Sequence, residues 1–446
     1  MKGAALKRLW TAQDLRNRLL ITVGLLVLYR LAAHVPVPGV DRDAIAQILQ
    51  SATGAGNLLS LFDLLSGGTV SRFSVLAMGV YPYITAQIIL QLMVPIIPAL
   101  KQRMEDDPRE GKQFMERWTY YLAIPMASLN AIGQIRLFQS SGLPILPHFG
   151  FSGDNLLPTI TTLITMTGGT MFAIWLGELI SEYGIRNQGL SLIIFSGIVS
   201  GLPRSVGQLW SDEQTRYAGI ALFLVLVAIT VFAIVVVTQG RRNVPVMYPG
   251  RRIGRRQSMP VRGSLPLLVN MAGMIPIIFA SAILSFPAIL AQFFTQSQRE
   301  WVRNFALGMQ DLFANQQNGG YITIYFFMVV LFAFFYTDVL FQQQNYGENL
   351  KRVGAQVPGV TQGAPTQKYL NKVLRRITLP GATLLGTVAV LPLLVGLLLV
   401  GFTSGSNAFF AIGSGLLIVV GVVKETFFGL ETELKLRGYD ESLLVS

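Results

Sequence analysis

Long apolar stretches separated by short polar segments dominate the chain. A helix needs roughly 20 apolar residues to cross a hydrocarbon core of about 30 Å. Ten stretches approach this length, at residues 19–36, 73–97, 117–138, 156–177, 188–203, 217–238, 265–290, 320–341, 377–400 and 408–425. The fifth reaches it only by extending through the glycines around it. The pattern predicts an all-α membrane protein with ten transmembrane helices, because the alternation typical of membrane barrels is missing.

Composition supports this class and limits the chemistry. Apolar residues make up 52% of the chain and charged residues 13%, about half of the roughly 25% that is usual in soluble domains. The polar start and the lack of a small-residue cleavage site predict that the first helix is retained. Without cysteine, and with only two histidines, we expect no disulfide, no metal site and no cofactor.

The basic residues are distributed unevenly over the predicted loops. Lys and Arg number 26 in the two termini (Lys424 counted with the C-terminal one) and in 98–116, 178–187, 239–264 and 342–376, against six in 37–72, 139–155, 204–216, 291–319 and 401–407. Because positively charged loops stay in the cytoplasm, both termini and the two large basic loops are predicted to face it.

The loop 239–264 holds seven arginines and no acidic residue, which is more than orientation requires. Topology alone explains part of this charge. The remainder suggests an acidic partner, for which anionic lipids, an acidic protein surface and RNA all qualify.

The middles of the predicted helices carry almost no ionisable groups. Arg30, Glu178, Asp338, Lys424 and Glu425 all lie towards helix ends. Ion-coupled transporters and pumps usually place such groups near the bilayer midplane. No nucleophile–base pair, metal-ligand spacing or phosphate loop stands out either, so the sequence disfavours both ion-coupled transport and enzymatic activity.

Several local patterns remain open at this stage. The segment 57–68, NLLSLFDLLSGG, is too short to span the membrane and ends at a Gly-Gly break; it suits an interfacial helix or a re-entrant element equally. Prolines lie inside apolar runs at Pro82, Pro125, Pro276 and Pro392. Aliphatic pairs at helical spacing are ordinarily lipid-facing or core residues; they occur at Val80 and Ile84, Ile194 and Ile198, and Ile275 and Ile278.

Five longer segments make the chain similar to a known family. They read GVYPYITAQIILQLM (79–93), IRNQGLSLIIFSGIVSGLP (185–203), LPLLVNMAGMIPIIFASAIL (265–284), YLNKVLRRITLPGA (369–382) and LLIVVGVVKETFFGLETELKLRGY (416–439). Over essentially its whole length the chain resembles the SecY family, the central subunit of the Sec protein-conducting channel.

The resemblance implies an hourglass-shaped pore between two inverted pseudo-symmetric halves of five helices. An odd number of helices per half inverts the second half, which agrees with the count of ten. The segments would be a cytoplasmic N-terminal segment 1–18, a first half 19–203, an external hinge 204–216, a second half 217–425 and a cytoplasmic tail 426–446.

The resemblance also implies roles for particular residues. The pore ring would comprise Val80, Ile84, Ile194, Ile198, Ile275, Ile278 and Ile418, with Ile275 the weakest candidate. The plug would comprise Asn57, Leu58, Leu59, Leu61, Phe62, Asp63, Leu64, Leu65, Gly67 and Gly68. The polar residues of a lateral gate, between helices two and three and helices seven and eight, would be Gln87, Gln91 and Asn270; the alternative is that they bind neighbouring helices together and never separate.

The family's docking loops imply a third set of residues. Those expected to bind the motor ATPase SecA or the ribosome are Arg241, Arg242, Arg251, Arg252, Arg255, Arg256, Arg262, Lys351, Arg352, Lys368, Lys372, Arg375 and Arg376. Thr361 stands where the family commonly has an arginine, so either Arg352 replaces that contact or activation by the partner differs.

Together these features predict a passive channel for unfolded preproteins that also releases membrane helices sideways. Expected partners are the small subunits SecE and SecG, SecA, the ribosome, signal sequences and anionic lipids. The alternative function is secondary transport of small amphipathic solutes. The expected location is a bacterial plasma membrane, with a thylakoid membrane as the alternative.

Overall fold

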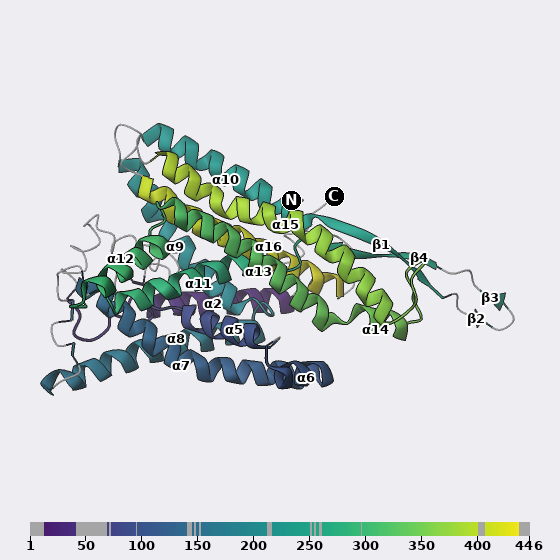
Figure 1. The fold of residues 1–446 in the computed structure, drawn as a ribbon, viewed down its shortest axis with the longest axis horizontal. Helices are drawn as coiled ribbons and strands as arrows, with labels where there is room; N and C mark the ends of the chain where they lie inside the picture. The colour runs from purple at the N-terminus through teal and green to yellow at the C-terminus, as the bar shows by residue number, and fades with distance from the viewer. Residues whose placement is uncertain are drawn as a thin grey trace.

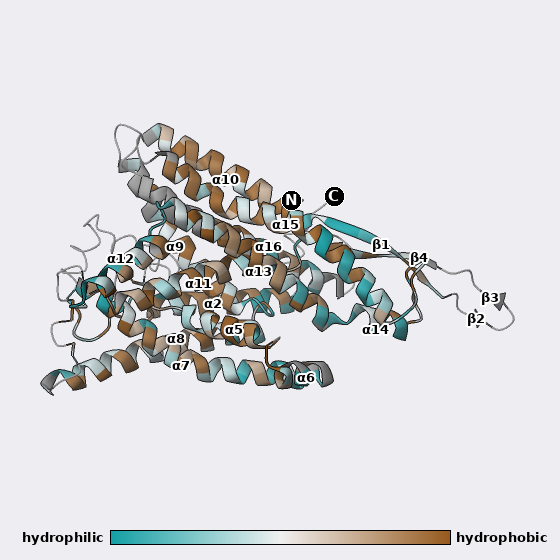
Figure 2. Ribbon diagram, in the orientation of Figure 1, coloured by the Kyte–Doolittle hydropathy of each residue, from teal (hydrophilic) through white to brown (hydrophobic). Residues whose placement is uncertain are grey.

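The computed structural model describes residues 13–41, 69–70, 73–94, 96–140, 145–146, 149–150, 153–211, 216–249, 252–253, 256–257, 261–295, 297–399 and 406–436. Most of these residues are helical, and the helices run side by side along the longest axis of the molecule (Figure 1). Apolar residues predominate along the helices, whereas hydrophilic residues gather at β1 (Arg241–Tyr248) and around α14 (Tyr346–Arg352) (Figure 2). We call the end of the molecule that carries β1 and α14 the basic end.

Ten helices form two groups of five. The first group is α2 (Gln13–Ala32), α5 (Tyr81–Met93), α7 (Pro108–Ser140), α8 (Leu156–Tyr183) and α9 (Gly189–Ser211), with α6 (Pro98–Asp106) and the short 3-10 helix η1 (Gly153–Asn155) between them. The second group is α10 (Arg216–Gln239), α11 (Ile275–Gln292), α13 (Gly319–Gln344), α15 (Ala364–Leu399) and α16 (Ser406–Leu436), with α12 (Glu300–Ala314) and α14 (Tyr346–Arg352) between them.

Every one of the ten predicted stretches overlaps one of these helices, and the all-α fold is confirmed. Within the described residues, four helices are long and apolar enough on their own to cross a membrane: Leu156–Tyr183, Tyr217–Gln239, Gly319–Arg352 and Ala364–Leu397. The pair Tyr81–Met93 and Pro98–Met104, bent by 97°, makes a fifth candidate. The bend follows from Pro98, because the residue before a proline is driven into extended backbone, as Ile97 is.

Two predicted helices are shorter than their apolar stretches. Residues 73–80 form turns ahead of α5, and the start of the stretch 265–290 belongs to a strand ahead of α11. Each helix follows a glycine with a positive φ, 52° at Gly79 and 62° at Gly273, and has a proline in its first turn. Pro82 and Pro276 therefore open helices and do not lie inside them as predicted, because a first-turn proline gives up no helical hydrogen bond.

The basic loop 239–264 is not an irregular loop. Strands β1 (Arg241–Tyr248) and β4 (Val261–Leu268) pair antiparallel from Arg241 opposite Leu268 to Tyr248 opposite Val261, and β2 (Arg252–Ile253) pairs with β3 (Arg256–Gln257) nearer the tip. The hairpin projects beyond the helices (Figure 1). Its β-branched and apolar residues were overlooked because arginines dominate the segment.

Helical structure also extends into other segments predicted as loops or tail. The segment 342–376 contains α14 and the first turns of α15, α16 continues past residue 425 to Leu436, and α9 continues past Pro203 to Ser211. The segment 291–319 contains the amphipathic helix α12. The hydrophobic pattern missed α12 and α14 because neither helix contains a long apolar run.

The two groups of helices meet along two seams. On one side α11 packs against α5 and α7, and on the other α9 packs against α10 and α16. A continuous buried cluster of apolar residues lies between the groups and includes side chains of α5, α9, α11, α13, α15 and α16. The centre of the molecule is therefore filled by aliphatic and aromatic side chains.

Candidate functional site

The seven predicted pore-ring residues gather in that central cluster. Val80, Ile84, Ile194, Ile198 and Ile418 are buried members of it, and Ile275 and Ile278 are partly buried against it. They come from α9, α11, α16 and the start of α5, which lie far apart in the sequence. Aliphatic side chains packed together in this way exclude water and present no hydrogen-bonding groups. We call these seven residues the apolar seal.

The two helices that begin at this seal start in the same way. Val80 and Met274 are the N-cap residues of α5 and α11, with φ and ψ of −93° and 4° in one and −95° and −6° in the other. Each lies between a glycine of positive φ and a helix with a proline in its first turn. This Gly-x-x-Pro repeat is a local trace of the symmetry between the halves, and it makes Met274 the counterpart of Val80.

Sequence reasoning missed Met274 and the residues that hold it. The Oε1 atom of Glu425 on α16 accepts a hydrogen bond from the Met274 N–H at 3.3 Å. A side chain at Gly421 would overlap Met274, and one at Gly273 would overlap the Glu425 carboxylate. Because a carboxylate at a helix N-terminus satisfies an otherwise unpaired N–H, Glu425 fixes the first turn of α11. The repeat was the signal that could have revealed Met274.

Arg30 supports the seal from α2. Its Nη2 atom donates to the carbonyl oxygens of Ser196 at 2.7 Å and Gly197 at 3.1 Å. Both carbonyls belong to the turn of α9 between the ring residues Ile194 and Ile198. An ionised donor makes these hydrogen bonds stronger than neutral ones. Arg30 therefore holds this turn of α9 in position beside the ring.

The seam between α5 and α7 on one side and α11 on the other is where a lateral gate is expected. The Tyr81 hydroxyl donates to the Ala282 carbonyl oxygen at 2.6 Å, linking α5 to α11. Gly133 of α7 lies so close to α11 that an added Cβ would be 2.6 Å from Ile289 Cγ2. Within the described residues, the Tyr81 hydrogen bond and close apolar packing thus link the two sides of the seam. Sequence reasoning missed these four residues.

The three predicted gate residues occupy different positions. Gln91 on α5 hydrogen-bonds with the Tyr336 hydroxyl of α13, while its Oε1 atom has no partner among the described residues. Gln87 is half-buried on the same helix. Asn270 lies outside the helices and donates from Nδ2 to the Gly273 carbonyl at 2.9 Å. The structure brings Gln91 to the α5–α13 contact but leaves Asn270 in the turn before α11, and a gating role for all three stays a prediction.

At the basic end, the two loops predicted to bind partners join into one unit. Met247 on β1 exchanges two backbone hydrogen bonds with Gln356, of 2.8 and 2.9 Å. A separate apolar core underlies this contact and draws residues from β1, β4, α14 and the start of α15; it includes Val246, Leu267, Val357 and Leu370. We call this unit, residues 241–268 and 346–376, the basic platform. Sequence reasoning treated its two halves as independent loops.

Most of the predicted docking residues lie exposed on the platform. Those described with exposed side chains are Arg241, Arg242, Arg262, Lys351, Arg352, Lys368, Lys372, Arg375 and Arg376. The backbones of Arg252 and Arg256 lie in β2 and β3, whereas Arg251 and Arg255 fall outside the described residues. Thr361 is exposed and its carbonyl accepts from the Thr366 hydroxyl at 2.7 Å. The ten predicted plug residues, within 57–68, also fall outside the described part of the chain.

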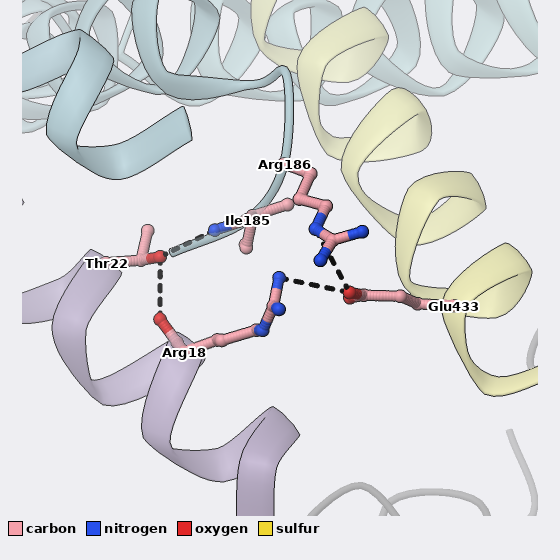
Figure 3. Close-up of polar contacts among 5 residues, drawn as sticks. All are labelled: Arg18, Thr22, Ile185, Arg186 and Glu433. Atoms are coloured by element: carbon pink, nitrogen blue, oxygen red, sulfur yellow. Dashed lines mark hydrogen bonds and ion pairs between the residues drawn. The ribbon is translucent and has the colours of Figure 1, made fainter. Parts of the chain in front are cut away.

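Beside the platform, a polar junction ties three segments together (Figure 3). Glu433 of α16 pairs with Arg18 of α2 at 3.1 Å and with Arg186 of the α8–α9 turn at 3.8 Å. The Thr22 hydroxyl accepts from the Ile185 N–H at 3.2 Å and donates to the Arg18 carbonyl at 2.8 Å. An adjoining cavity of about 520 Å³ is lined by polar residues of the same turn, by the approach to α11 and by α16. A recess therefore lies at the start of α11, beside Met274.

Comparison with known proteins agrees with this geometry. A family model described as SecY matches residues 74–427. The chain is 37% identical over 454 residues to the protein translocase subunit SecY of Streptomyces scabiei, covering 98% of both chains. It is 35% identical over 453 residues to the protein of the same name from Chlamydia muridarum, covering 98% of this chain and 97% of that one.

Solved structures share the fold at lower sequence identity. One described as a protein conducting channel matches with a TM-score of 0.62 and 16% identity, over 97% of this chain and 94% of that chain. Another, of a SecY protein whose plug domain is said to stabilise the closed state of the translocation channel, matches with a TM-score of 0.61 over the same shares. The predicted family is confirmed: the chain belongs to the SecY family.

Proposed function

We propose that this chain conducts unfolded polypeptides through the ring formed by Val80, Ile84, Ile194, Ile198, Ile275, Ile278 and Ile418. The chain is a protein-conducting channel and not an enzyme, as its family is. The observation that carries the assignment of the ring is the convergence of these seven residues on one buried cluster. An aliphatic constriction suits this task because it offers a passing chain no specific hydrogen bonds and resists ion flow when closed.

The ring is tested by the resting ion conductance of the channel in planar bilayers. Replacing Ile84, Ile194 and Ile278 by glycine is expected to raise that conductance, because the lost side chains open the seal to water. A control variant with Val27, Val225 and Ile229 replaced by glycine removes similar volume from exposed positions on α2 and α10. Equal conductance in the two variants would remove these isoleucines from the constriction.

Membrane helices and signal sequences are proposed to leave between α5 and α7 on one side and α11 and α13 on the other. The close contact of Gly133 with Ile289 supports this seam and supplies a test. A Cβ at position 133 would lie 3.9 Å from the Ile289 Cβ, within the usual range of a disulfide. The chain contains no cysteine, so the double variant Gly133→Cys, Ile289→Cys would carry one defined pair.

Oxidation of that pair is expected to stop the release of membrane helices into the bilayer, and reduction is expected to restore it. The two single-cysteine variants serve as controls, since neither can form the bridge. Undiminished helix release from the fully oxidised protein would contradict a gate at this seam.

The basic platform is proposed to dock SecA or the ribosome on the cytoplasmic face of a bacterial plasma membrane. Its exposed arginines and lysines support this, because such a surface attracts carboxylates or phosphates. SecE and SecG are proposed as the membrane subunits that accompany the chain, and the segment 57–68 as the plug beneath the ring. A thylakoid membrane fits the same orientation.

Charge reversal tests the docking surface. Changing Arg251, Arg252, Arg255 and Arg256 to glutamate is expected to weaken the binding of SecA and of ribosomes, most strongly at low salt. Reversal of Arg299 and Arg303, which are exposed near α12, provides the control. If the platform variant bound SecA and ribosomes with unchanged affinity, the charge of the loop would serve only to orient the chain in the membrane. Uptake of small solutes by proteoliposomes without SecA or ribosomes would instead favour the alternative of a solute transporter.

A further inference from the structure

A small pocket lies between α13 and α15, near the basic end. Its volume is about 310 Å³, and it is lined by Phe334, Phe335, Thr337 and Asp338 from α13 and by Leu374, Arg375 and Thr378 from α15. We propose that this pocket binds the headgroup of a zwitterionic phospholipid that carries a primary ammonium group. The proposal concerns the lipid around the channel and does not depend on the partners proposed above.

Two buried hydroxyl groups in the pocket lack partners. Thr337 and Thr378 are both buried, and neither Oγ1 atom makes a hydrogen bond within the described part of the chain. Other threonines of the same two helices do bond within their helix: Thr323 donates to the Gly319 carbonyl and Thr387 to the Thr383 carbonyl, both at 2.9 Å. Buried hydroxyls are normally satisfied. Two unsatisfied ones on residues that line the same pocket point to a ligand that accepts hydrogen bonds.

Charges of both signs stand at the same place. Arg375 Nη2 lies 3.5 Å from Asp338 Oδ1, and the other carboxylate oxygen accepts from Gln342 Nε2 at 2.9 Å. The Arg375 contact is long and uses one of five N–H groups, so the guanidinium can still bind a phosphate in a bidentate manner. Asp338 can receive an ammonium group. An arginine and a carboxylate side by side match a headgroup that carries both charges.

The position of the pocket suits a lipid. The predicted apolar stretches end at residue 341 in α13 and begin at residue 377 in α15, so Asp338, Arg375 and Thr378 lie at the level of the headgroups. Phe334 and Phe335 are half-buried one turn further into the membrane, where the glycerol and the first acyl carbons of a bound lipid would lie. One orientation of the bound lipid satisfies all of these groups. Its phosphate contacts Arg375 and the two hydroxyls, its ammonium group contacts Asp338, and its acyl chains run along the phenylalanines.

Photo-crosslinking tests the pocket directly. The full-length channel with its membrane subunits, carrying Phe335→benzoylphenylalanine, is placed in nanodiscs with equal parts of phosphatidylethanolamine, phosphatidylcholine and phosphatidylglycerol. After irradiation, mass spectrometry identifies the lipid attached at this position. We expect phosphatidylethanolamine to form about three times as many adducts as either other lipid, since phosphatidylcholine cannot donate hydrogen bonds to Asp338 and phosphatidylglycerol has no cation for it.

Three further variants separate the pocket from general attraction. Arg375→Gln, and the pair Thr337→Val with Thr378→Val, are expected to abolish the threefold preference. The valines keep the volume and leave no polar group unpaired, so folding is preserved. Arg376→Gln is the matched control, because the neighbouring exposed arginine does not line the pocket. Adducts in equal proportion in the unaltered channel, a preference for phosphatidylglycerol, or an equal loss of preference in the Arg376 variant would overturn the proposal.

Discussion

Gly168 and Gly169 are adjacent in α8, yet alanine should have opposite effects at the two positions. A Cβ at Gly168 would meet nothing within 4 Å, whereas one at Gly169 would overlap the Val75 carbonyl oxygen and lie 2.6 Å from Val75 Cγ1. Val75 belongs to the turn that leads to Val80 in the ring. That turn cannot easily retreat, because the Val75 N–H donates to the Val35 carbonyl and the Val37 N–H to the Phe73 carbonyl, at 2.9 and 3.0 Å.

The magnitude follows from two opposing terms. Alanine in place of glycine in a helix gains about 1 kcal/mol. At position 169 the new Cβ would also lie 2.7 Å from the Val75 carbonyl carbon, about 0.7 Å inside ordinary contact, and such overpacking typically costs 1–3 kcal/mol. Because the obstructing atoms are backbone, we take the upper end. Gly169→Ala should therefore lose about 2 kcal/mol and Gly168→Ala should gain about 1 kcal/mol.

The assay is thermal unfolding of both variants in detergent, followed by resting ion conductance in bilayers. With an unfolding entropy of about 2.1 cal/mol/K per residue, 1 kcal/mol shifts the Tm of a 446-residue chain by about 1 °C. The two variants should differ by about 3 °C, and only Gly169→Ala should leak ions, because its turn displaces Val80. Equal Tm values and equal conductance would refute the packing of this turn against α8.

Three further predictions concern other supports of the channel. Arg30→Gln should raise resting conductance several-fold in planar bilayers, since α9 loses its anchor beside the ring, whereas Arg136→Gln on α7 should not; equal conductance in both would exclude this role. Glu425→Ala should lower stability by about 1 kcal/mol, the usual value of a helix cap, and an unchanged Tm by calorimetry would show that α11 needs no cap. Leu267→Ala should cost 2–5 kcal/mol within the platform core; limited proteolysis should then cut between β1 and β4 sooner than in the parent, and an equal rate would contradict a folded platform.

The apolar pattern correctly predicted the ten helices because an apolar stretch overlaps each of them. The pattern failed where something other than the length of an apolar run determines the local structure. Pro82 and Pro276 sit in long apolar runs, so the runs were interpreted as helix throughout, while the left-handed glycines ahead of them begin the helices later. The strands β1 and β4 were hidden by arginines, since charge obscures the alternation on which strand prediction depends.

Some residues of the candidate site could be predicted from the sequence and others could not. The family segments led to seven ring residues that the structure gathers into one cluster, and to exposed basic residues on the platform. They did not lead to Met274, Glu425, Tyr81 or Gly133, because each acts through a contact with a helix distant in the chain. Neither the hydrogen bond from Tyr81 to Ala282 nor the pairing of Met247 with Gln356 leaves a trace in local sequence.

The sequence by itself determined that the chain lies in a membrane, how many helices cross it and which residues are basic, because these properties are sums over local composition. Only the tertiary structure decided that aliphatic residues of four separate segments gather in one cluster, that two basic loops share one apolar core, and that Thr337 and Thr378 line a common pocket. Such properties depend on which helices are neighbours. Packing of side chains distant in sequence determines that, and no local pattern encodes it.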